Sequence, residues 1–366
     1  MSNSSVDHPQ TGSDDTDFVV VERPTARVSL PAKDPEIHDH DETDEESVDE
    51  DGGGNNEDFL ADFPDDTEEL EVVNQRVKSL ESFKLKRFAG HLKRLCLRQN
   101  AISALDLGMF EQLTKLEELD LYDNKIKTEG VSNSSTGQDN LSSLCTLDLS
   151  FNLLKTIPDV LSRLTSLKTV YFVQNRISKI TGLEALGASL TSLELGGNKI
   201  RRIEGLDALV NLEELWLGKN KLPMLENLGT LTKLRILSLQ SNRITKIENL
   251  EKLQNLEELY LSHNGVEKLE GLEHNKQLKT LDLGMNFIRT IENISHLTLL
   301  EELWLNGNKI PDLGALEAQL KQITSLQTIY LEGNPCQERE GASYRRKIML
   351  YLPQLRQIDA TFAKPL

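Results

Sequence analysis

The amino-acid sequence predicts an α/β solenoid, a curved right-handed coil of short repeats with a parallel β-sheet on its concave side. Three observations lead to this fold class. The template L-x-x-L-x-L-x-x-N-x-I occurs eleven times with conservative exchanges, its Asn recurs every 22 residues from Asn198 to Asn308, and Leu always stands eight positions before that Asn. Such a pattern with a period in the twenties is typical of leucine-rich repeats. We therefore expect a leucine-rich-repeat solenoid with short helical or 3-10 segments on its convex side.

The apolar positions of the template predict a strand that is buried on one face. Residues five and three before each Asn, such as Leu303 and Leu305, are apolar in every repeat and alternate with other residue types. The Asn follows the strand, where its amide can bond backbone groups that the turn leaves open. An amphipathic helix does not explain the pattern, because L-x-L alternation has period 2. One coil cannot bury its own apolar face, so the coils must stack.

Charge separates the N-terminal segment from the repeats. Residues 1–75 contain 24 Asp or Glu and three Lys or Arg, which gives −21; the whole chain carries −18, so the remaining residues carry +3. A segment so acidic and so poor in apolar residues cannot offset its chain entropy by burial. Within it, Arg27-Val-Ser-Leu30 partly matches the Arg-Val-x-Phe docking peptide of phosphatase regulators, with Leu30 in the aromatic position.

These patterns predict four segments. They are a disordered acidic tail at 1–71, an N-terminal cap at 72–91, about eleven repeats at 92–340 and a C-terminal cap at 341–366. The last cap should contain a helix that ends near Pro353.

No motif in the sequence indicates an enzyme, so we expect no catalytic residue, cofactor or metal. Neither a glycine-rich phosphate loop nor a metalloprotease helix motif is present. His274 and His296 are one period apart, but no third ligand shares their register. The three cysteines lie far apart in the sequence, so we expect them to be isolated thiols in a reducing compartment. No apolar run is long enough to cross a membrane, and the N-terminus lacks a secretory signal, so no membrane partner is expected.

Strand alternation turns the residues six and four before each Asn outward, onto the concave face. Both tryptophans of the chain fall in these two columns, together with several tyrosines, eight acidic residues and one arginine. Strand propensity explains aromatic residues in strands but not their concentration in one column. Aromatic residues are enriched in interface hot spots, and an acidic face selects a basic partner surface. It disfavours nucleic acid, which needs Lys and Arg.

The repeats and the C-terminal segment together resemble a known family. The segments Leu-Cys-Leu-Arg-Gln-Asn100, Leu-Asp-Leu-Tyr-Asp-Asn124 and Leu-Tyr-Leu-Ser-His-Asn264, and the ending Tyr344-Arg-Arg-Lys with Arg356-Gln-Ile-Asp-Ala-Thr-Phe362, are similar to leucine-rich-repeat regulators of the type-1 serine/threonine protein phosphatase. The resemblance covers residues from about 72 to 362. It implies a non-catalytic regulatory subunit whose concave face binds the catalytic subunit of the phosphatase and controls its activity, maturation or localisation.

The resemblance also implies which residues contact the phosphatase. All of them lie in the outward columns, and the family commonly has Phe where Tyr171 and Trp216 stand. The implied contacts, with Tyr260 added from the same column, are Asp148, Tyr171, Glu194, Trp216, Tyr260, Asp282, Glu302, Trp304 and Tyr330.

Further expectations from the family are a ternary complex with a small phosphatase inhibitor, a role in the cell cycle and chromosome segregation, and a location in nucleus and cytoplasm. The alternative is a leucine-rich-repeat adaptor for another protein, as in ciliary or ribonucleoprotein assembly.

Overall fold

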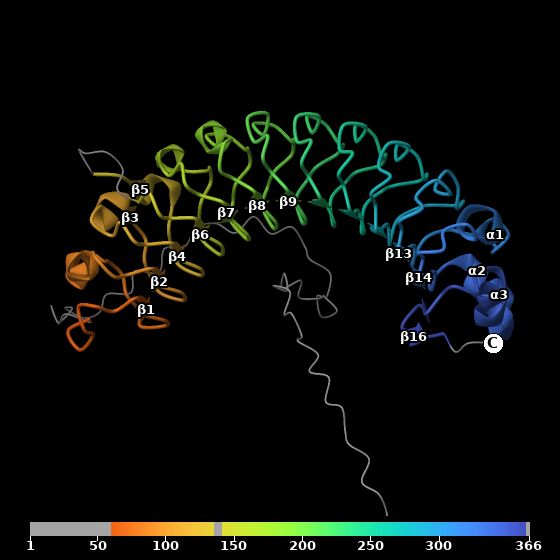
Figure 1. Cartoon of the computed structure of the whole chain (residues 1–366), viewed down its shortest axis with the longest axis horizontal. Helices are drawn as coiled ribbons and strands as arrows, with labels where there is room; N and C mark the ends of the chain where they lie inside the picture. Colours follow the sequence, from red (N-terminus) through yellow and green to blue (C-terminus); the bar gives the residue numbers. More distant parts are fainter. Residues whose placement is uncertain (1–59, 135–140, 364–366) are drawn as a thin grey trace, which may run out of the picture. The chain divides into compact units, whose positions relative to one another are not determined.

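In the computed structural model, residues 60–134 and 141–363 are described, and their strands form one long parallel sheet (Figure 1). Each template copy supplies a three-residue strand that covers the positions six to four before its Asn, and each strand pairs in parallel with its neighbour in the next coil. Only the last pair, β15 with β16, is antiparallel. In sheet order the strands are β1 (Glu69–Glu71), β2 (Arg94–Cys96), β4 (Glu118–Asp120), β6 (Thr146–Asp148), β7 (Thr169–Tyr171), β8 (Ser192–Glu194), β9 (Glu214–Trp216), β10 (Ile236–Ser238), β11 (Glu258–Tyr260), β12 (Thr280–Asp282), β13 (Glu302–Trp304), β14 (Thr328–Tyr330), β15 (Gln357–Ile358) and β16 (Thr361–Phe362).

Short helices occupy the other side of the coils. Figure 1 shows the strands along the inner side of the stacked repeats and the helices on the outer side, so the predicted leucine-rich-repeat fold is confirmed. The helices are η1 (Glu81–Phe83), η2 (Leu85–Phe88), η3 (Leu107–Phe110), η4 (Thr128–Gly130), η5 (Asp159–Arg163), η6 (Glu184–Leu186), α1 (Ala315–Leu320), α2 (Pro335–Glu340), η7 (Gly341–Ser343) and α3 (Tyr344–Tyr351).

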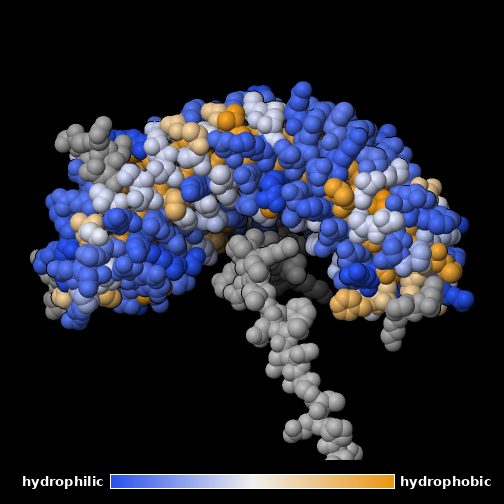
Figure 2. All heavy atoms as spheres, in the orientation of Figure 1, coloured by the Kyte–Doolittle hydropathy of each residue, from blue (hydrophilic) through white to orange (hydrophobic). Residues whose placement is uncertain are grey.

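Between strands and helices lies one continuous apolar core, which is built from the template leucines. Leu303 and Leu305 have no exposed surface, and the equivalent residues of the other repeats are buried in the same way. In the view of Figure 2, hydrophilic residues cover most of the described surface, and hydrophobic ones show as small separate patches. Stacking therefore buries what a single coil would expose.

The template asparagines form a ladder that ties each coil to the one before it. Asn264 Nδ2 donates to the carbonyl oxygens of Leu239, at 2.9 Å, and Leu261, at 3.1 Å, while its Oδ1 accepts from the amide of Ile244 at 2.9 Å. The other ten template asparagines have equivalent bonds, for example Asn308 to Leu283 at 2.8 Å. Each side chain thus satisfies buried backbone groups of two coils.

The fold begins earlier than the expected boundary between residues 71 and 72. Strand β1 pairs with β2, and Leu60 and Leu70 have no exposed surface, so residues 60–71 belong to the N-terminal cap rather than to a disordered tail. This coil does not match the repeat template, because Gln75 stands at the Asn position and Thr67 at the first Leu position. The rest of the predicted tail, residues 1–59, lies outside the described residues.

Two insertions and the C-terminal cap complete the chain. Within the 28 residues between Asn124 and Asn152, β5 (Val131–Ser132) pairs in parallel with β3 (Leu105–Asp106), and residues 135–140 lie outside the described part. Helix α1 fills the longer repeat before Asn334. In the segment predicted as the C-terminal cap, α3 ends at Tyr351, and β15 then adds one more strand to the sheet. Cys96, Cys145 and Cys336 are free thiols.

Candidate functional site: the acidic and aromatic concave face

The parallel register aligns the predicted contact residues into one row across the sheet. Tyr171 lies opposite Glu194, and Glu194 lies opposite Trp216. Further along, Asp282 lies opposite Trp304, which in turn lies opposite Tyr330. Because each of these residues ends its strand, all of them share one face of the pleated sheet. Eight of the nine predicted residues stand in this row, from Asp148 to Tyr330, and Glu302 starts the same strand as Trp304.

Two aromatic pairs dominate the C-terminal half of the row. The rings of Trp216 and Tyr260 are 6.3 Å apart at an interplanar angle of 21°, with Ser238 on the strand between them. The rings of Trp304 and Tyr330 are 5.4 Å apart and tilted by 60°. All four side chains are partly exposed. They offer apolar surface to a partner at little ordering cost, because their neighbours already hold them.

In two of these four residues, Trp304 and Tyr260, a glutamate two positions earlier accepts a hydrogen bond from the polar atom of the aromatic side chain. Trp304 Nε1 donates to Glu302 Oε2 at 3.1 Å, and the Tyr260 hydroxyl donates to Glu258 Oε2 at 2.7 Å. Burial, reinforced by the bond to Glu258 and its charge, raises the pKa of Tyr260. The tyrosine therefore stays neutral, and each glutamate combines an aromatic anchor with a carboxylate that can meet a basic group.

Glu194 is the most perturbed carboxyl of the face. Burial first, and then the charges of Asp148 and Glu214, raise its pKa from 4.5 to about 7. Burial likewise raises the pKa of Asp148 above its ordinary value. A cluster of partly desolvated carboxylates destabilises the free protein and would be relieved by a cationic partner, so this arrangement is typical of a functional site.

Asp148 and Asp282 also serve the fold. Asp148 Oδ1 accepts from the amide of Ser150 at 2.8 Å, and Asp282 Oδ1 accepts from that of Gly284 at 3.0 Å. Only 4% of Asp282 is exposed, between Tyr260 and Trp304 on the neighbouring strands. Of the predicted contacts, Asp282 is thus the least accessible.

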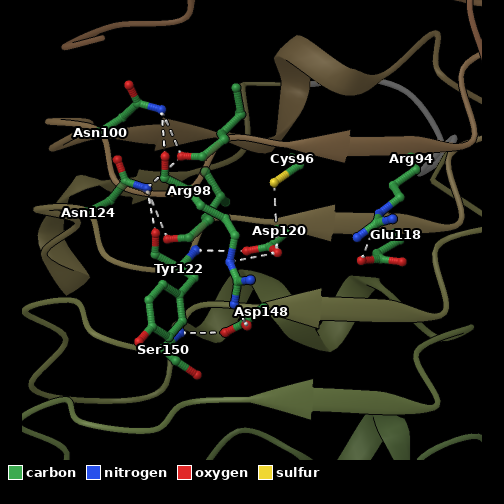
Figure 3. Close-up of polar contacts among 12 residues, drawn as sticks. Arg94, Cys96, Arg98, Asn100, Glu118, Asp120, Tyr122, Asn124, Asp148 and Ser150 are labelled. Atoms are coloured by element: carbon green, nitrogen blue, oxygen red, sulfur yellow. Dashed lines mark hydrogen bonds and ion pairs between the residues drawn. The ribbon is translucent and has the colours of Figure 1, made fainter. Parts of the chain in front are cut away.

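Arg98, Asp120 and Tyr122 form a cluster with Asp148 at the N-terminal end of the face, and of these four only Asp148 was among the predicted contacts (Figure 3). The Arg98 guanidinium lies 3.1 Å from Asp120 Oδ2 and 3.9 Å from Asp148 Oδ2. Arg98 Cζ also lies over the ring of Tyr122, 4.4 Å from its centroid, and the ring centroids of Tyr122 and Phe151 are 4.8 Å apart. Arg98 and Tyr122 stand two residues before their Asn, a position that also faces outward, and this register is the signal that could have found them. A partner cation must compete with Arg98 for Asp148.

The raised pKa of Glu194 leads to a stability prediction. A carboxyl whose folded pKa lies above its unfolded value stabilises the fold below about pH 4.5, and that contribution is lost as the pH rises through about 7. Glu194→Gln removes the ionisation, so we expect the variant to be more stable than wild type at pH 8 by on the order of 2 kcal/mol, once partial solvent exposure is allowed for. Urea unfolding at pH 5 and pH 8 measures the difference, which should fall to about a quarter of its pH 8 size at pH 5.

The control is Glu301→Gln, at an exposed glutamate one residue before β13. It should leave stability nearly unchanged at both pH values. A Glu194→Gln variant that is less stable than wild type at pH 8 would contradict the assigned shift.

Among residues 60–134 and 141–363, no group of three or more His, Cys, Asp or Glu side chains could hold a metal ion. No helix in the described part is long and apolar enough to cross a membrane.

Family models for leucine-rich repeats match three parts of the chain. They cover residues 67–128 ("Leucine rich repeat"), residues 188–230 ("Leucine Rich repeats (2 copies)") and residues 232–364 ("Leucine-rich repeat"). Solved structures agree on the fold. An internalin from Listeria monocytogenes is 25% identical with a TM-score of 0.61, over 81% of this chain and 87% of that one. A leucine-rich-repeat protein from Leptospira interrogans is 29% identical with a TM-score of 0.60, over 74% of each chain.

Curated relatives of the chain are named as regulatory subunits of protein phosphatase 1. The chain is 37% identical over 173 residues to an Arabidopsis thaliana homologue of a protein phosphatase 1 regulatory inhibitor subunit, which is 46% of this chain and 49% of the relative. It is 48% identical over 99 residues to a protein phosphatase 1 regulatory subunit of Saccharomyces cerevisiae, 27% of this chain and 28% of the relative. The match to the human regulatory subunit 7 is 56% over 46 residues, 13% of this chain and 12% of the relative.

The chain therefore matches at most about half the length of these relatives. It is a leucine-rich-repeat protein whose sequence is similar to regulatory subunits of protein phosphatase 1.

Proposed function

We propose that this chain is a non-catalytic regulator that binds the catalytic subunit of the type-1 serine/threonine phosphatase through its concave face. The observation that carries the proposal is the row of aromatic and acidic side chains across neighbouring strands, with Trp304 and Tyr330 at one end and Asp148 and Glu194 toward the other. The names of the relatives supply the identity of the partner.

The face favours a partner surface that combines basic and apolar character. The tilted rings of Trp304 and Tyr330 provide an apolar anchor, and Glu302 stands beside them with its carboxylate already oriented. Partly buried carboxylates give charge-assisted bonds to Arg or Lys that are stronger than those between exposed groups. The catalytic subunit should therefore present Arg or Lys next to an apolar patch.

The raised pKa of Glu194 makes this binding sensitive to pH. A cation that docks beside Glu194 favours the carboxylate, so binding near pH 7 is accompanied by release of a proton. We expect affinity to increase as the pH rises from 6 to 8.

The test is calorimetric titration of the full chain with purified type-1 catalytic subunit at pH 6, 7 and 8, together with phosphatase activity on a phosphorylated substrate. Saturable binding that strengthens with pH supports the proposal. Absence of binding at all three pH values would contradict it and leave the adaptor for another protein as the better account. Phosphatase added with and without a small phosphatase inhibitor tests the proposed ternary complex in the same experiment.

The remaining parts of the proposal follow from the family resemblance. They are control of phosphatase maturation or localisation, a role in the cell cycle and chromosome segregation, and presence in nucleus and cytoplasm. Fluorescent tagging of the full chain through mitosis tests the last two.

A further inference from the structure

Four successive coils carry an unbroken series of cations just beyond the ends of β7, β8, β9 and β10. The windows 173–179, 196–202, 218–224 and 240–246 contain nine Lys or Arg and no Asp or Glu. We name these nine residues the basic strip: Arg176, Lys179, Lys199, Arg201, Arg202, Lys219, Lys221, Arg243 and Lys246.

Backbone hydrogen bonds hold the strip in register. The amides of Lys199, Lys221 and Arg243 each donate to a carbonyl of the preceding coil, at 2.8, 2.8 and 2.9 Å. Together with Arg176 in the first of the four coils, these residues therefore follow one another at the spacing of neighbouring strands, about 5 Å. Eight of the nine side chains are exposed, and Lys221 is partly exposed.

Most of this charge has no counterpart in the described fold. Arg202 pairs with Glu226 at 3.2 Å and Lys246 with Glu248 at 3.4 Å. The other seven cations form no ion pair with any residue of 60–134 or 141–363. Seven like charges at this spacing repel one another, and an anionic partner would relieve that repulsion.

The opposite end of the strands shows that this solenoid can pair stacked charges. One residue before β9 to β13, the coils alternate Glu213, Arg235, Glu257, Lys279 and Glu301. Glu257 bonds Arg235 at 2.9 Å and Lys279 at 2.7 Å, and these two bonds lower its pKa to about 2. The basic strip has the contrary arrangement, and this contrast indicates a docking surface for an anion.

Acidic residues border the strip on both sides, which limits the width of the anion it can take. On the concave side lie Glu194 and Glu214. On the other side, six positions after the template Asn, stand Glu204, Glu226 and Glu248, and the two ion pairs of the strip lead to this column. A membrane surface or a nucleic-acid duplex would cover these glutamates as well and be repelled by them. A single extended chain would touch the cations alone.

The residue types of the strip favour a peptide over a single-stranded nucleic acid. Proteins that bind such strands combine basic grooves with aromatic side chains on which the bases stack. The four windows contain no Phe, Tyr or Trp. Nothing in the strip would therefore hold the bases.

The density of positive charge favours phosphorylated residues in that peptide. The seven unpaired cations lie within the three strand steps from β7 to β10, or ~14 Å, which is one charge for every ~2 Å. An extended chain advances ~3.3 Å per residue, so Asp or Glu alone cannot match this density. A phosphorylated residue carries up to about two negative charges, and the guanidinium of arginine forms paired hydrogen bonds with phosphate. Three of the seven cations are arginines: Arg176, Arg201 and Arg243.

We propose that the basic strip binds an extended segment of a partner protein in which several phosphorylated residues stand among Asp and Glu. The rigid register of the four coils holds the cations in place before the segment arrives, so little order has to be created on this side of the contact. The inference goes beyond the proposed function and does not depend on it, because the strip lies outside the concave strands and needs no phosphatase to bind its ligand.

Fluorescence anisotropy of the full chain with a labelled short peptide, in which phosphoserine and Asp alternate, tests the proposal without any phosphatase. We expect saturable binding. The same peptide with serine in place of phosphoserine should bind at least about tenfold more weakly, because most of the negative charge is gone. Raising the NaCl concentration to about 0.5 M should weaken binding of the phosphorylated peptide by a similar factor.

Two variants that each lose four positive charges separate the strip from general attraction. Binding of the phosphorylated peptide should fall at least about tenfold when four strip residues are replaced together: Arg176→Gln, Lys199→Gln, Lys221→Gln and Arg243→Gln. It should change less than about twofold when four exposed cations elsewhere are replaced: Lys115→Gln, Lys252→Gln, Lys276→Gln and Arg346→Gln.

Circular dichroism checks that both variants fold. If the strip variant does not, the pair Arg176→Gln and Arg243→Gln, at two exposed side chains, is compared with the pair Lys252→Gln and Arg346→Gln. Equal affinity for the two peptides, equal losses in the two variants, or no saturable binding would each overturn the proposal. Tighter binding of oligouridylate, or of vesicles that contain phosphatidylserine, would overturn it in favour of a nucleic acid or a membrane.

Discussion

Leu303→Ala is expected to lower the free energy of unfolding by roughly 2–5 kcal/mol, because Leu303 has no exposed surface and lies between Leu281 and Ile329 of the two neighbouring coils. The shortened side chain leaves a cavity that the stacked backbone cannot close, since the hydrogen bonds of the sheet and the Asn ladder fix the distance between coils. Urea unfolding followed by circular dichroism measures the change.

Trp304→Ala is the matched control, one residue along the same strand. Its ring is partly exposed on the concave face and contacts Tyr330 and Glu302, so its removal leaves no core cavity and should cost about 1 kcal/mol or less. Equal losses for the two variants would show that the inward and outward positions of β13 are wrongly assigned.

Asn264→Ala is expected to cost about 3–5 kcal/mol. The substitution leaves the amide of Ile244 without its acceptor, at a site where the Asn is only 8% exposed, and removes one donor each from the carbonyls of Leu239 and Leu261, which keep the side-chain amides of Asn242 and Asn286. The unsatisfied buried amide costs about 1–3 kcal/mol, and each of the two lost hydrogen bonds adds about 1 kcal/mol. The measurement is again equilibrium unfolding in urea.

Asn255→Ala, in the same repeat, is the control: it shows how much stability is lost when an Asn side chain outside the ladder is removed. Asn255 is exposed and donates one bond, at 2.8 Å to the carbonyl of Thr232, so its loss should be about 1 kcal/mol or less. If Asn255→Ala is as damaging as Asn264→Ala, the ladder does not have the role assigned to it.

Periodic features of this fold are readable from the sequence because each repeat restates them. The inward leucines, the outward columns and the Asn ladder each depend on one residue type at one register, and eleven copies remove the ambiguity of a single strand. The nine predicted contact residues accordingly lie on the concave strands.

Features that occur once were missed. The first coil lacks both template markers, with Gln75 and Thr67 in their places, although Leu70 and Val72 fill the core in the usual way. The near burial of Asp282 and the reach of Arg98 across two strands to Asp148 depend on the sizes of side chains in adjacent coils. A one-coil template contains no information on such contacts, which explains why the accessibility of each site residue had to come from the structure.

Binding of the type-1 phosphatase catalytic subunit to the concave face can be tested by one comparison of affinities. Calorimetry with the purified catalytic subunit is performed on wild type, Trp304→Ala and Phe287→Ala. Phe287 is an aromatic residue that is 50% exposed and lies one position after its Asn, outside the concave strands.

Trp304→Ala should weaken binding by about 30-fold or more, equivalent to about 2 kcal/mol, as loss of an aromatic hot spot does. Phe287→Ala should change affinity by less than about threefold, because scattered exposed aromatic residues outside an interface contribute little. A folded Trp304→Ala variant that binds as tightly as wild type, or a loss confined to Phe287→Ala, would show that the concave face is not the binding surface.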